Sequence, residues 1–134
     1  MFVWSPPVSA LFSEFTLSSP RGPLQLANRG VVAPMCQYSS DDGLASDWHL
    51  VHWASLLNSG AAMLMLEATA VTARGRITPH CLGLWDDTTA AALSEHLQRA
   101  RRHAPPVPVA IQLAHAGRKG SSEVPWREIG RAHV

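Results

Sequence analysis

Several features are scarce in this chain of 134 residues, and their scarcity excludes whole classes of protein. Its two cysteines, Cys36 and Cys81, are too few for a disulfide framework and fit a reducing compartment such as the cytoplasm. The formal net charge is only +1, which gives no basis for a nucleic-acid partner or an anionic membrane. No stretch approaches the roughly 18 apolar residues that a spanning helix needs. The composition therefore predicts a cytoplasmic globular protein.

Common site signatures are missing as well. The chain has no G-x-G-x-x-G, H-E-x-x-H or C-x-x-C segment. His49 and His52 lie three residues apart on a predicted helix, so a metal site that they share with Cys36 stays an alternative to helix-to-sheet hydrogen bonding. Residues 1–10 carry no Lys or Arg and contain Pro6–Pro7, which argues against a signal peptide and predicts an unstructured leader.

Three apolar runs end abruptly in clusters of small or hydrogen-bonding residues. The runs cover residues 31–33, 61–66 and 107–111, and the clusters that follow them cover residues 34–38, 67–70 and 112–119. Continuous apolar runs are typical of buried parallel strands, and α/β proteins bind ligands at the carboxyl ends of such strands. The three clusters are therefore predicted to form one wall of a ligand site.

The remaining pattern predicts the order hairpin, strand, helix, strand, helix, strand. Weak alternation on both sides of a turn at residues 18–23 predicts a short β-hairpin within residues 11–30. The other expected elements are a strand over 31–35, a helix over 48–58 with Asp47 as its N-cap, a strand over 61–66, a helix opened by Asp86–Asp87 and stopped by Pro105–Pro106, and a strand from Val107.

Such βα units occur in doubly wound open sheets and in (β/α)8 barrels. The missing glycine-rich turn after the first strand favours the barrel. The predicted fold class is thus α/β, a partial (β/α)8 TIM barrel with an N-terminal hairpin and about three βα units over residues 11–127. Because a barrel of this kind needs about 250 residues, we interpret the sequence as an N-terminal fragment.

Four side chains in the polar clusters are candidates for chemistry. The Tyr38 hydroxyl can donate a proton or bind a carbonyl, and the Cys36 thiol can contact a redox cofactor. Gln112 both donates and accepts, which suits the edge of a heterocycle such as a flavin pyrimidine ring. Glu67 is either a catalytic acid or a buried, hydrogen-bonded one. An ordinary structural role stays open for all four.

Six segments, in this order, resemble the Old Yellow Enzyme family of NADH:flavin oxidoreductases. They are Ala33–Ser39, Asp47–His52, Glu67–Val71, Gly75–Thr78, Leu82–Asp87 and Ile111–Lys119. The cysteine of the first segment is similar to that of the bacterial NADPH-dependent ene-reductases. The resemblance covers about residues 11–126, whereas residues 128–134 depart from it and are interpreted as an artefactual tail.

The resemblance implies an oxidoreductase that binds FMN and takes a hydride from NADPH or NADH. Its expected substrate is a small-molecule activated alkene, such as an enone, which receives the hydride from flavin N5. By matching position, the residues expected to contact the flavin are Ala33, Pro34, Met35, Cys36, Ala68 and Gln112. Tyr38 is the expected catalytic and substrate-binding residue, and no metal is implied.

In this family further substrate, flavin and phosphate contacts lie later in the chain. The 134-residue chain by itself is therefore expected to be inactive, and a full-length form is a candidate homo-oligomer. Two alternatives stay open. One is a non-catalytic interaction module whose open sheet edge pairs with another protein or with itself, and the other is the metal-binding protein described above.

Overall fold

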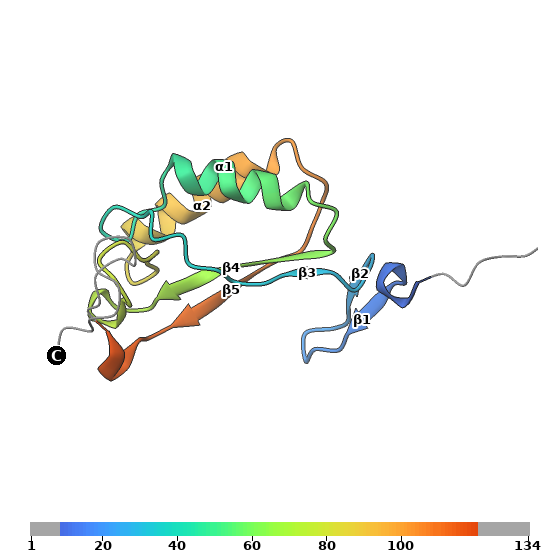
Figure 1. Cartoon of the computed structure of the whole chain (residues 1–134), viewed down its shortest axis with the longest axis horizontal. Coiled ribbons are helices and arrows are strands. Elements are labelled where there is room, and N and C mark those ends of the chain that lie inside the picture. Colours follow the sequence, from blue (N-terminus) through green and yellow to red (C-terminus); the bar gives the residue numbers. More distant parts are fainter. Residues whose placement is uncertain (1–8, 121–134) are drawn as a thin grey trace, which may run out of the picture.

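The computed structural model describes residues 9–120, which contain a small β-hairpin and a three-stranded sheet with two helices on one of its faces (Figure 1). In chain order the elements are η1 (Ala10–Phe12), β1 (Phe15–Leu17), β2 (Leu24–Leu26), β3 (Val31–Val32), α1 (Asp47–Leu57), β4 (Met63–Ala70), η2 (Ala73–Gly75), α2 (Asp87–Arg101), β5 (Val109–Ala114) and η3 (Gly117–Lys119). The predicted α/β class is confirmed. In this part of the chain neither helix is long and apolar enough to cross a membrane.

The sheet has the order β3-β4-β5, and both of its pairings are parallel. Each crossover contains one helix, and α1 and α2 lie on the same side of the strands (Figure 1). The carboxyl ends of the strands therefore point the same way. The hairpin lies at the opposite end, beside the start of β3, and its antiparallel pairing of Phe15 with Leu26 confirms the predicted hairpin.

The core fills the space between the sheet and the helices. Leu64 and Leu66 of β4 pack there with Trp53 and Leu57 of α1 and Ala100 of α2, and each is at most 2% exposed. Alternate residues of a strand point to opposite faces, so the neighbouring Met63 and Met65 are only half-buried. The apolar run that predicted β4 thus has one face buried under the helices and an opposite face that is only partly covered.

Helix α1 begins one residue earlier than predicted. Ser46 is its N-cap, whereas Asp47, the predicted cap, is the first helical residue. The Ser46 N–H donates to His49 Nδ1 over 3.0 Å, and this bond satisfies a backbone donor at the start of the helix. Asp47 instead lies near Arg99 of α2, with 3.6 Å between carboxylate and guanidinium.

Two strand boundaries also differ from the sequence prediction. β3 ends at Val32 rather than near residue 35, and its pairing with β4 stops at Val32 and Leu64. β5 begins at Val109 rather than Val107, since Pro106 and Pro108 have no N–H to donate to a neighbouring strand. β4 continues to Ala70, past an irregularity in its pairing with β5 between Leu66 and Ala68.

The N-cap of α2 offers a test of local stability. Asp86 Oδ1 accepts from the Thr89 N–H over 2.8 Å, and the bonds from Thr89 are the main reason why the pKa of Asp86 is lowered. We expect Asp86→Ala to lower the midpoint of thermal unfolding by about 3–6 °C at pH 7. A lowered carboxyl pKa stabilises the fold above the ordinary pKa, and this contribution is lost as the pH falls through the lowered value.

Thermal melts of both proteins at several pH values measure this effect. Asp87→Ala is the matched control, because Asp87 lies next in sequence and does not cap the helix. An Asp86→Ala deficit that is equally large at the most acidic pH would contradict the assignment.

Candidate ligand site at the carboxyl ends of the strands

The polar clusters that follow the three strands meet at one end of the sheet. Ala68 of β4 and Gln112 of β5 are register partners in neighbouring strands. The Ala68 backbone N–H donates to the sulfur of Cys36, which follows β3. The structure thus brings Cys36, Ala68 and Gln112 side by side, as the sequence pattern predicted.

Tyr38 lies against Cys36, and its hydroxyl donates a hydrogen bond to the Cys36 sulfur. Burial is the main cause that raises the pKa of both groups, and the negative charge of Glu67 raises the two pKa values further. Both groups are therefore protonated at neutral pH. Tyr38 in particular remains a hydrogen-bond donor.

Several predicted contact residues face open space. Ala33, Met35 and Gln112 are exposed, whereas Pro34, Cys36 and Ala68 are half-buried. Within residues 9–120 the side-chain amide of Gln112 makes no hydrogen bond, and the residue is exposed. Small side chains and an unengaged amide along one edge fit a flat heterocycle with a polar rim.

Glu67 and His49 form a buried pair behind this edge. The His49 side chain is fully buried and that of Glu67 is 2% exposed, with 3.4 Å between Nε2 and Oε1. Glu67 is a buried, hydrogen-bonded acid, because its Oε2 accepts the Gln37 N–H. His49 faces the sheet at Glu67 but forms no hydrogen bond to it. Sequence reasoning missed Ser46 and Trp48, whose side chains bond to Ser39 O and Gln37 Oε1.

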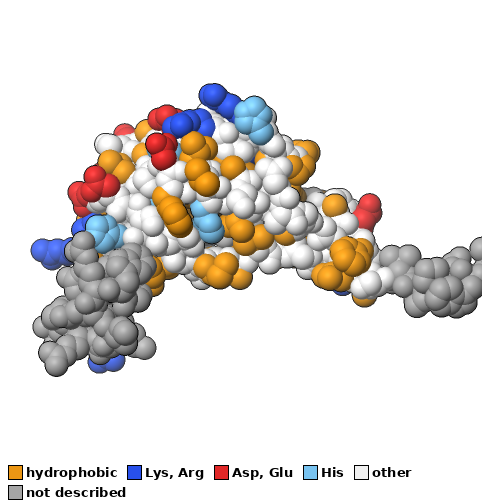
Figure 2. All heavy atoms as spheres, turned by 45° about the horizontal axis from the view of Figure 1, so that its top comes forward, with side chains coloured by type: hydrophobic (Ala, Val, Ile, Leu, Met, Phe, Trp, Pro, Cys, Tyr) orange, Lys and Arg blue, Asp and Glu red, His pale blue; other side chains and the backbone are white. Residues whose placement is uncertain are grey.

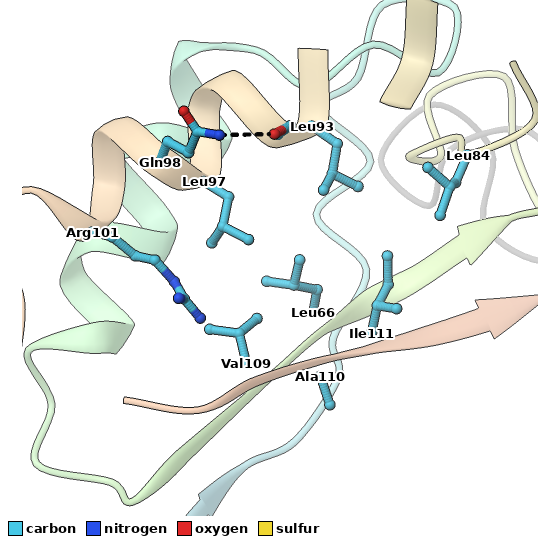
Figure 3. A pocket seen from close by; sticks show the side chains of 10 residues that line it. Leu66, Leu84, Leu93, Leu97, Gln98, Arg101, Val109, Ala110 and Ile111 are labelled. Atoms are coloured by element: carbon cyan, nitrogen blue, oxygen red, sulfur yellow. Dashed lines mark hydrogen bonds between the residues drawn. The ribbon is translucent and has the colours of Figure 1, made fainter. Parts of the chain in front are cut away.

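A sizeable groove lies away from the strand ends. A groove of about 480 Å³ lies between α2 and β5, where Leu93 and Leu97 face Val109 and Ile111 (Figure 3). A small cavity of about 10 Å³ lies next to Glu67 and has room for a single water molecule. The groove is apolar and lies on the helical side of the sheet (Figure 3). The candidate ligand site is therefore identified by the polar side chains at the strand ends and not by the volume of a cavity.

The metal-binding alternative loses its basis. Both ring nitrogens of His49 face protein groups, Ser46 N–H and Glu67. Within residues 9–120 no three His, Cys, Asp or Glu side chains lie close enough together to hold a metal ion. The helical face seen in Figure 2 also carries charges of both signs rather than a patch of one sign.

A parallel α/β fold with a polar site at its strand ends defines a class of ligand-binding proteins. Residues 11–129 match the model of the NADH:flavin oxidoreductase / NADH oxidase family. The chain belongs to this family, and the resemblance found in the sequence is confirmed.

Three relatives illustrate the similarity. The chain is 44% identical over 128 residues to an NADPH dehydrogenase of Geobacillus thermodenitrificans, covering 94% of this chain and 35% of the relative. It is 42% identical over 117 residues to an NADPH dehydrogenase of Halalkalibacterium halodurans, covering 86% and 33%. An NADH:flavin oxidoreductase of Gibberella zeae is 44% identical over 115 residues, with 86% and 27% covered. The chain thus spans about a third of the length of these relatives.

Solved structures have the same arrangement of elements. Morphinone reductase superposes with a TM-score of 0.69 at 25% identity, over 83% of this chain and 28% of that protein. An Old Yellow Enzyme from Pichia sp. gives a TM-score of 0.68 at 19% identity over the same fractions, which shows the fold alone. The α/β fold of residues 9–120 is therefore that of the N-terminal part of these proteins.

Proposed function

We propose that this chain is the flavin-contacting N-terminal part of an FMN-dependent oxidoreductase. The proposed reaction transfers a hydride from NADPH or NADH to an activated alkene such as an enone. The observation that carries the proposal is the juxtaposition of Cys36, Ala68 and Gln112 in a member of a flavin oxidoreductase family. The alternative of a non-catalytic interaction module has no comparable support.

The proposed fold of the whole protein is a (β/α)8 barrel, of which this chain supplies the hairpin and about three βα units. Three strands in sequential order with both helices on one face support it. One half of a doubly wound sheet has the same order, so the likeness to Old Yellow Enzyme structures favours the barrel. The half-buried Met63 and Met65 would then line its interior.

The described residues fit a flavin. Bound FMN would supply a carrier that accepts a hydride from the nicotinamide and passes it on from its N5 position. The backbone of residues 33–36 and the methyl group of Ala68 would contact the ring system, and the Gln112 amide would bind its pyrimidine edge. The Cys36 thiol would lie beside the ring and influence its reduction potential.

Tyr38 is the proposed substrate-contacting and catalytic residue. Its raised pKa keeps the hydroxyl protonated at neutral pH, so it can donate a hydrogen bond to the carbonyl oxygen of an enone. The same hydroxyl now donates to Cys36, and this contact supports a donor beside the proposed flavin position. Substrate binding would therefore exchange one hydrogen bond of Tyr38 for another.

A chimaera tests this function directly. Residues 11–120 would replace the matching N-terminal third of the Geobacillus thermodenitrificans NADPH dehydrogenase, which is 44% identical. We expect a yellow protein with stoichiometric FMN that oxidises NADPH when cyclohexenone is added. A folded, colourless chimaera would contradict the proposal.

The 134-residue chain by itself is compared with the chimaera. The expectation that it is inactive by itself stays a prediction, and titration with FMN followed by flavin fluorescence measures it. We expect weak binding and no turnover of cyclohexenone. A Gln112→Leu chimaera is the internal control, because it removes the proposed pyrimidine contact at an exposed position without disturbing the core.

A further inference from the structure

We propose that Glu67, together with His49, is a positioning residue that fixes the turn from Cys36 to Tyr38 against the sheet. The turn's importance for catalysis rests on the proposed function, whereas the positioning itself is a property of this chain. The inference comes from a buried carboxylate that no step of the proposed reaction uses.

Glu67 lies at the irregularity of β4, between Leu66, which pairs with Ile111, and Ala68, which pairs with Gln112. An extra residue in one strand re-aims a side chain, and such bulges are frequent next to active sites. Here the carboxylate is buried, and its Oε2 accepts the backbone N–H of Gln37 over 2.9 Å. Glu67 therefore joins the centre of the sheet to the residue that precedes Tyr38.

His49 faces the other oxygen of the carboxylate. Its Nδ1 accepts the Ser46 N–H, so the ring proton of the neutral imidazole resides on Nε2 and points at Glu67 Oε1, 3.4 Å away. Within residues 9–120 neither Nε2 nor Oε1 has a hydrogen-bond partner, so their 3.4 Å approach is an electrostatic contact. A buried carboxylate is costly unless another group faces it, so the imidazole beside Oε1 and the Gln37 N–H on Oε2 together link α1, the sheet and the turn.

The backbone of the turn needs such support. Tyr38 has φ 51°, in the left-handed region that bulky residues rarely occupy. Strained residues of this kind persist when their surroundings over-determine them, and they cluster at functional sites. The bond from Gln37 N–H to Glu67 acts directly before Tyr38, and Ser39 Oγ donates to Gln37 O directly after it.

Glutamine at position 67 cannot reproduce this arrangement. A carboxylate presents one oxygen to the Gln37 N–H and the other to His49 Nε2–H, whereas a side-chain amide has one oxygen and a donating NH₂ group. The imidazole cannot move its proton to Nδ1, because Nδ1 already accepts from Ser46. Glu67→Gln therefore keeps the size of the side chain but sets an NH₂ donor against either the Gln37 N–H or His49 Nε2–H.

Hydrogen exchange in the 134-residue chain tests the positioning. In the wild type we expect the Gln37 amide to be protected, and exchange at the rate of an unstructured peptide would overturn the proposal without any variant. In Glu67→Gln we expect the Gln37 amide to exchange at least tenfold faster, with unchanged protection of Leu64 in the core. Equal Gln37 protection in both proteins would also overturn it.

Two variants control this experiment. Glu95→Gln makes the same chemical change at an exposed acid of α2 and should leave Gln37 exchange unchanged. His49→Gln keeps the carboxylate but removes its partner on α1, and we expect an intermediate acceleration. If Glu67→Gln does not fold, the exchange of the Gln37 amide in His49→Gln and in the wild type decides whether Glu67 positions the turn.

A readout of function separates positioning from mere stability. In the chimaera with the Geobacillus enzyme, we expect Glu67→Gln to slow the alkene-dependent step about tenfold while flavin reduction by NADPH changes less than twofold. Equal slowing of both steps would mean that the pair only stabilises the fold. If the wild-type chimaera binds no flavin, the proposed function fails, and the exchange experiment still decides whether Glu67 positions the turn.

Discussion

Replacement of Trp53 by alanine is expected to lower the free energy of unfolding by about 3–5 kcal/mol, because it removes the largest side chain of the core. Trp53 is 1% exposed and belongs to the cluster that joins α1 to the sheet. Its ring also packs against His49, with 5.4 Å between ring centroids. The variant leaves a cavity under the helix that the backbone cannot close.

Chemical denaturation followed by circular dichroism measures this loss. Trp48→Ala is the matched control on the same helix, because Trp48 is 56% exposed and we expect a loss below about 1 kcal/mol from its bond to Gln37. If Trp53→Ala fails to fold, Trp53→Phe should give a smaller loss in the same direction. Similar values for the two alanine variants would show that α1 does not pack as described.

Local signals explain why the sequence predicts the helices well. α1 and α2 lie within a residue or so of their predicted starts, because caps such as Asp86 and breakers such as Pro105–Pro106 act through neighbours in sequence. The strand ends are less predictable. β4 continues past Glu67 because it pairs with β5, and a polar residue inside a strand looks like its end when the partner strand is unknown.

The candidate site likewise has one part that the sequence predicts and one part that it does not. The meeting of Cys36, Ala68 and Gln112 is predictable, because parallel strands bring their carboxyl ends to one edge. The network behind it is only partly predictable. Glu67 bonds to Gln37 and faces His49, and which buried acid pairs with which histidine depends on the register of a bulge that no local pattern encodes. The left-handed backbone of Tyr38 likewise has no signal in its sequence.

Tyr38→Phe is expected to have the largest effect on activity. If the Tyr38 hydroxyl donates to the substrate carbonyl, its loss should slow alkene reduction by the chimaera about 10- to 100-fold, in the range of a lost catalytic hydrogen bond or proton donor. Flavin reduction by NADPH should change little, since that step does not involve the carbonyl. Stopped-flow absorbance of the two half-reactions measures both rates separately.

Cys36→Ala distinguishes this role from a structural one. It removes the sulfur that now accepts from Tyr38 but keeps the hydroxyl, so we expect alkene reduction to fall far less than in Tyr38→Phe. If the two variants slowed alkene reduction equally, the role of the Tyr38 hydroxyl would be its hydrogen bond to Cys36 and not a contact with the substrate. Equal effects of Tyr38→Phe on both half-reactions would argue against a substrate contact, because a residue that meets only the substrate cannot change the reaction that precedes substrate binding.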